Sequence, residues 1–164
     1  MMLACPTSVS RPTRLVILVA LTVAGLFGLL APAVPGAEAS DQWPQFRGPQ
    51  ATGVAAGAKL PAEIGPDENV VWKTAVGKGH SSPVIWGDRI YLTTFQDKKL
   101  LTLALAADSG QLIWQAEAPY EKRERTHRIG SYATPSAATD GEHVVSFFGS
   151  AGLFCCDTDG RIVW

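Results

Sequence analysis

The chain repeats itself at a period near 50 residues, and this period constrains the fold more than any other feature. Pro83 and Pro135 lie 52 positions apart, and Trp114 and Trp164 lie 50 apart. Two segments recur in order. Residues 82–91 recur as 134–145, with two extra residues, and residues 103–114 recur as 153–164, with a turn that is one residue shorter. A unit of this length that ends in Gly-x-x-x-Trp is typical of a β-propeller blade.

Short apolar runs bounded by Gly, Pro or Asp fill both copies of the repeat. The chain has 16 Gly and 11 Pro among 164 residues, and no segment keeps a helical spacing of apolar residues. We therefore predict an all-β fold. The expected strands are 70–73, 84–86, 89–94, 100–105, 111–115, 136–139, 143–148, 152–156 and 161–164.

Each copy ends with a glycine turn followed by tryptophan. Gly110 precedes Trp114, and Gly160 precedes Trp164. A large aromatic ring at this position can bury about 150–250 Å². Because the two tryptophans recur in register, we expect each ring to pack against a neighbouring blade, with filling of the core of its own blade as the alternative.

The repeated segment 103–114, with its copy 153–164, resembles the tryptophan-docking motif, A-x-D-x-x-T-G-x-x-x-W, of PQQ-repeat (quinoprotein alcohol dehydrogenase-like) β-propellers. Ala104, Gly110 and Trp114 fall on this motif in the first copy, and Gly160 and Trp164 in the second. Residues 43–49 and 131–135 are also similar to exported bacterial PQQ-binding-like repeat proteins. The first copy departs from the motif, since Ala106 replaces its Asp and Ser109 its Thr.

The resemblance implies a ring of seven or eight blades, of which this chain holds about two. We expect an N-terminal extended segment over 40–66, then propeller repeats over 67–164 made of a closing strand (70–73) and two blades. The chain is accordingly interpreted as a partial β-propeller, the N-terminal fragment of a longer one.

The N-terminus has the pattern of a secretory signal peptide. Arg11 and Arg14 precede an uncharged apolar run over 15–31, and Ala37-Glu38-Ala39 forms a small-x-small cleavage site. We predict that residues 1–39 are removed and that the mature chain is exported to the periplasm or outside the cell. The alternative is an uncleaved membrane anchor. If the segment is cleaved, we expect the chain to contact a membrane only through the signal segment before cleavage.

The charge balance disfavours nucleic acid as a partner, because 14 Lys and Arg face 15 Asp and Glu. The densest charge run, 121–128, lies between the two copies and is predicted to be a loop. It is interpreted either as a solvated loop or as a site for an anionic partner.

Cys155 and Cys156 are the residues with the clearest link to a cofactor. In quinoprotein alcohol dehydrogenases, two adjacent cysteines form a disulfide ring against the quinone. Here the pair aligns with Leu105 and Ala106 of the first copy, and adjacent strand residues point to opposite faces, which disfavours that bridge. The histidines lack metal-ligand spacing, so no metal site is predicted: His80, His127 and His143.

We predict a non-catalytic binding or scaffolding module of the bacterial cell envelope, engaging a protein partner or the remaining blades of the same propeller. The alternative is a PQQ-dependent alcohol or sugar dehydrogenase. No cofactor is predicted for this chain, and the resemblance implies PQQ and calcium only for a full-length ring. A third hypothesis, carbohydrate binding, depends on Trp43 and Trp86 as surface residues.

Overall fold

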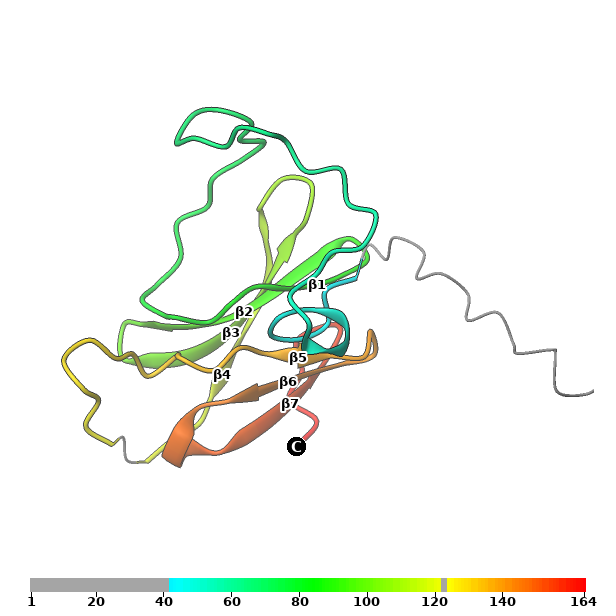
Figure 1. Ribbon diagram of the computed structural model, residues 1–164. Helices are drawn as coiled ribbons and strands as arrows, with labels where there is room; N and C mark the ends of the chain where they lie inside the picture. Colours follow the sequence, from blue (N-terminus) through cyan, green and yellow to red (C-terminus); the bar gives the residue numbers. More distant parts are fainter. Residues whose placement is uncertain (1–41, 122–123) are drawn as a thin grey trace, which may run out of the picture. The chain divides into compact units, whose positions relative to one another are not determined.

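The computed structural model describes residues 42–121 and 124–164 (Figure 1). The predicted signal peptide and its cleavage site therefore lie outside the described residues. Among the residues described, no helix is long and apolar enough to cross a membrane.

The first sheet contains the first copy of the repeat. Its four antiparallel strands follow chain order, β1-β2-β3-β4, each joined to the next by a short turn (Figure 1). The turn between the first two strands is Gly87-Asp88, as its sequence predicts. The strands are β1 (Val84–Trp86), β2 (Arg89–Gln96), β3 (Lys99–Ala106) and β4 (Leu112–Ala118).

The second sheet contains the second copy and has three antiparallel strands in the order β5-β6-β7. These are β5 (Ala138–Thr139), β6 (His143–Phe147) and β7 (Leu153–Asp157). In the described ranges the only helical segments are two 3-10 turns, Pro49–Ala51 and Gly149–Ala151. The all-β prediction is confirmed.

Two of the predicted strands, 70–73 and 161–164, do not form strands in the structure. Residues 70–73 join neither sheet, and they contact the first sheet chiefly through the side chain of Trp72. Residues 161–164 form only a bridge from Ile162 to Cys156, flanked by backbone hydrogen bonds between Cys155 and residues 163–164. They lie beside β7 as β4 lies beside β3, but the ladder is too short to make a strand.

The main core lies between the two sheets. Val84, Tyr91, Ala104 and Trp114 are cross-strand partners, so they form one row on the same face of the first sheet. This row packs with Ala137 and Val144 from the second copy. The opposite face of the first sheet carries a separate leucine-rich cluster, formed by Leu92, Leu101, Leu103 and Leu105 with Ile90 beside it.

Hydrogen bonds also join the sheets. The buried hydroxyl of Thr102 donates to Ser146 Oγ across the interface, at 2.8 Å, and Thr93 Oγ1 donates to the Pro135 carbonyl at 2.8 Å. The N-terminal segment contributes as well, because Trp43 pairs with Ile85 of β1 and the Thr139 amide of β5 donates to the Pro44 carbonyl. Apolar packing and satisfied polar pairs therefore hold the two repeats together.

Candidate functional site

The tryptophan that follows the first glycine turn contacts the second repeat. Trp114 of β4 donates its indole Nε1–H to the Thr158 carbonyl at 2.8 Å. A Cβ atom added at Gly160 would lie 2.6 Å from the Trp114 ring, and Gly160 has a φ of +83°. Only glycine fits both the left-handed backbone and the close approach of the ring. The structure thus places two predicted motif residues against each other across the sheet–sheet interface.

Trp72 occupies the corresponding turn of the first repeat. Its Nε1–H donates to the Ala107 carbonyl at 2.9 Å, and Thr74 Oγ1 donates to the Gly110 carbonyl at 2.7 Å. A Cβ atom at Gly110 would overlap the Trp72 ring. The turns at Gly110 and Gly160 are therefore filled in the same way. Each receives a tryptophan that comes earlier in the chain than the sheet to which the turn belongs.

Ala104 explains how Trp114 reaches its position. Ala104 is fully buried between Tyr91 and Trp114 in the cross-strand row, and the two rings lie with centroids 5.8 Å apart. Leu105 pairs with Leu112 whereas Ala104 pairs with Trp114, which leaves Ile113 as a β-bulge. Trp114 lies on the face that meets the second sheet because it pairs with Ala104, and the bulge comes directly before it.

The same bulge recurs in the second repeat and sets the place of Trp164. Ile162 pairs with Cys156. The Cys155 amide donates to the Trp164 carbonyl, and the Cys155 carbonyl accepts from the Val163 amide. Cys155 and Cys156 therefore correspond to Ala104 and Leu105. The sequence alignment with Leu105 and Ala106 was wrong by one residue, because the shortening lies in the turn 157–160.

Trp164 nevertheless has no turn to fill among the described residues. It is 60% exposed, although its row is the counterpart of the buried row of the first sheet. We call this surface the far face of the second sheet. Phe147 and Leu153 are cross-strand partners on it and are 43% and 56% exposed. The far face consists of Ala138, Val145, Phe147, Leu153, Cys155 and Trp164.

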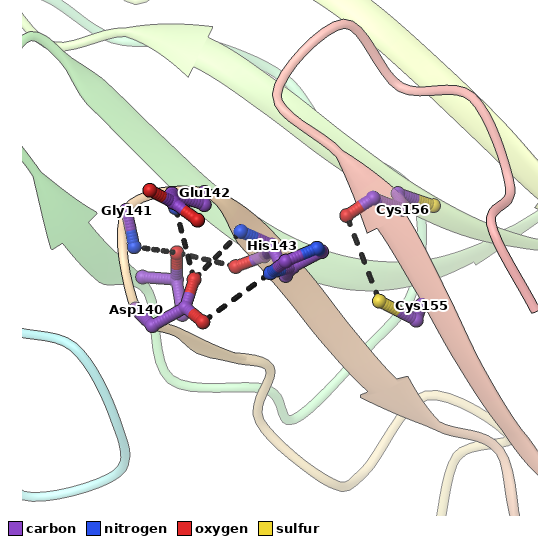
Figure 2. Close-up of polar contacts among 7 residues, drawn as sticks. Asp140, Gly141, Glu142, His143, Cys155 and Cys156 are labelled. Carbon is purple, nitrogen blue, oxygen red and sulfur yellow. Dashed lines mark hydrogen bonds and ion pairs between the residues drawn. The ribbon is translucent and has the colours of Figure 1, made fainter.

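The adjacent cysteines do not fit the quinone-contacting ring that the resemblance implies. Both are free thiols, and Figure 2 shows their sulfur atoms pointing apart on β7. Cys155 pairs with Val145 on the far face, whereas Cys156 pairs with Val144, which faces the first sheet. Burial raises the pKa of both thiols, that of Cys156 to about 11. Both are buried residues of β7.

Trp43 and Trp86 are half-buried rather than surface residues, which corrects the basis of the carbohydrate hypothesis. Trp43 covers Gly48, and Trp86 covers Gly141 in the turn between β5 and β6. An added Cβ atom at either glycine would overlap the ring. Tryptophan on glycine is thus the recurring contact of this chain, at four places.

Of the three histidines, His143 lies beside a carboxylate. His143 contacts Asp140 through Nδ1 at 3.3 Å, and the Asp140 carboxylate also accepts the amides of His143 and Glu142 at 2.7 and 2.9 Å (Figure 2). These backbone hydrogen bonds, that from His143 first, lower the pKa of Asp140 to about 2. No group of three potential metal ligands occurs within the described part of the chain.

The loop between the sheets forms cavities, which the sequence did not predict. Residues 126 and 128–132 share a cavity of about 480 Å³ with Lys78, Gly79, His80 and Phe95. A second cavity of about 280 Å³ shares residues 126 and 130–132 with the first and is also lined by Glu124 and His127. The described part of the charge run 121–128 therefore borders both cavities.

No protein-family model matches the chain, and no curated protein matches it significantly. The family resemblance stays a prediction from the sequence.

Proposed function

We propose that the chain is a non-catalytic binding or scaffolding module of the bacterial cell envelope, built as part of a β-propeller. The observation that carries this proposal is the exposed far face of the second sheet. Its counterpart on the first sheet is buried by the next repeat. A face with the same register and the same terminal tryptophan is suited to receive another sheet of the same kind, from the same propeller or from a partner protein.

The far face also indicates what its partner presents. Where the first sheet has Thr93 and Thr102 on its buried face, the far face has Phe147 and Leu153 at the corresponding positions. The partner surface should therefore be apolar rather than rich in hydroxyl groups. It should also carry a glycine turn that can accept the Trp164 indole.

The first sheet already contains such a surface. Its leucine-rich face is apolar, and its glycine turn receives Trp72. A direct test is to follow Trp164 with a second copy of residues 73–114, so that Trp164 takes the place of Trp72 relative to that copy. Hydrogen exchange of the indole N–H groups is then measured by NMR, with Trp164 assigned through Trp164→Phe.

We expect the Trp164 indole to exchange at least about tenfold more slowly in the extended chain than in the parent chain, because a buried hydrogen-bonded group exchanges only when the structure opens. Trp114 serves as the internal reference in both. The matched control carries Gly110→Ala in the appended copy only and should remove this protection. Unchanged exchange of Trp164, or random-coil amide shifts throughout the appended copy, would overturn the proposal.

The dehydrogenase alternative is tested separately. The cysteine geometry gives it no support, since the two thiols lie on opposite faces of β7. Titration with PQQ and calcium, followed by tryptophan fluorescence, should give no saturable quenching at micromolar quinone. Saturable quenching would favour a quinone-binding role instead.

Export is supported by the N-terminal pattern alone. If residues 1–39 are a cleaved signal peptide, N-terminal sequencing of the protein from the cell envelope should begin at Ser40. An uncut N-terminus in the membrane fraction would show the anchor alternative instead.

A further inference from the structure

The larger of the two loop cavities combines three separate parts of the chain. Lys78, Gly79 and His80 form one side, Phe95 near the end of β2 another, and residues 126 and 128–132 the third. Lys78 is held in place by its backbone, because its amide and carbonyl pair with Phe95 at 3.0 and 2.7 Å. The volume of this cavity, about 480 Å³, lies in the range of small-molecule sites.

The charges around this cavity differ from those of the chain as a whole. The chain has a formal net charge of −1, but the cavity is lined by Lys78, Arg128 and His80 and by no Asp or Glu. Within residues 42–121 and 124–164, neither Lys78 nor Arg128 forms an ion pair. Two cations that face one cavity without a carboxylate create a positive potential suited to an anion.

The remaining lining suits a ligand with a carbon ring and hydroxyl groups. Phe95 and Tyr132 pack with ring centroids 4.8 Å apart, and Ile129 adds an apolar side chain that is 72% exposed. Thr126 and Ser131 contribute hydroxyl groups. Inorganic phosphate or sulfate would use the cations but not the apolar wall, whereas a neutral sugar would leave the cations unused.

We propose that this cavity binds a sugar acid, a molecule of monosaccharide size that bears one carboxylate. Lys78 and Arg128 hold the carboxylate, the apolar wall contacts the C–H face of the ring, and the two hydroxyl side chains contact the sugar hydroxyls. This site is separate from the far face of the second sheet and holds or fails independently of it.

The experiment titrates the full chain with D-galacturonate and D-glucuronate by calorimetry and by NMR amide shifts. Saturable binding should shift the amides of residues 78–80 and 126–132, and the dissociation constant should rise with added salt. Lys78→Gln and Arg128→Gln should each weaken binding about tenfold, because each change removes a charged hydrogen-bond donor to the carboxylate. Both side chains belong to exposed residues, so the fold should be retained.

Arg161→Gln is the matched control. Arg161 is exposed, does not line the cavity and lies after the turn 157–160, so its loss should leave binding unchanged. Equal affinity for D-galactose, or sulfate that binds as well as the uronates, would overturn the assignment to a sugar acid. Absence of saturable binding by either uronate would overturn the site itself.

Discussion

The two sheets place equivalent tryptophans in opposite environments. Trp114 donates a hydrogen bond to Thr158 and covers Gly160, whereas Trp164, reached through the same β-bulge, is 60% exposed. The local sequence and backbone are alike in both, so they cannot account for the difference. A tryptophan of this motif is therefore buried by the next sheet, not by its own, and its contribution to stability depends on that neighbour.

The sharpest test of this comparison removes each ring in turn. Trp114→Ala should lower the free energy of unfolding by about 3 kcal/mol or more, as expected for loss of a packed aromatic ring and its hydrogen bond. Trp164→Ala should cost less than about 1 kcal/mol, since most of its side chain already contacts solvent. Urea denaturation followed by circular dichroism measures both. Equal costs would contradict the dependence on a neighbouring sheet.

The glycine beneath Trp114 can be tested with a control for backbone strain. Gly160→Ala should destabilise by about 2–3 kcal/mol, because the new methyl group meets the ring and the left-handed backbone disfavours alanine. Gly149 also has a positive φ, of +59°, but nothing lies within 4 Å of an added Cβ. Gly149→Ala should therefore cost only about 1 kcal/mol. Thermal unfolding of the two variants separates steric overlap from backbone strain.

The buried hydroxyl pair offers a smaller effect with a distinctive pattern. Thr102→Val or Ser146→Ala should each cost about 1–2 kcal/mol, because the remaining hydroxyl loses its partner in the interface. The double variant should cost little more than either single one. A double-mutant cycle in urea tests this, and strictly additive losses would show that the two hydroxyls do not depend on each other.

The smallest expected effect concerns pH and the turn between β5 and β6, on which Trp86 packs. Hydrogen bonds from His143 and Glu142 lower the folded-state pKa of Asp140 to about 2, from 3.8. A lowered pKa contributes stability that is fully present above the unfolded value and is lost as pH falls toward 2. The stability difference between the wild type and Asp140→Asn should therefore shrink between pH 5 and pH 2. A difference that stays constant over this range would contradict the role of the carboxylate.

Local patterns predicted the all-β fold, the bounds of β1 and the Gly87-Asp88 turn, because turn chemistry and strand alternation depend on nearby residues. They failed at 70–73, where one side chain rather than a backbone ladder makes the contact. They also failed at Trp43 and Trp86, since the sequence does not show which glycine each ring covers.

Most of the candidate sites could not be predicted for a related reason. Lys78 and Arg128 are 50 residues apart in the sequence but line the same cavity, in which the backbone of Lys78 pairs with Phe95. The one-residue error at Cys155 arose because the two segments were matched position by position although the turn of the second copy is one residue shorter. The pairing of Ile162 with Cys156, as Leu112 pairs with Leu105, gives the correct match.

The filled turn at Gly110 has a consequence for self-association. Head-to-tail association of identical chains would require the Trp164 of one copy to enter the Gly110 turn of the next, and repetition of such a contact builds a closed ring or an open filament. Trp72 already occupies that turn from within the same chain. Within the described residues, the chain therefore presents the Trp164 ring while the turns at Gly110 and Gly160 are both filled, so Trp72 opposes this mode of self-association.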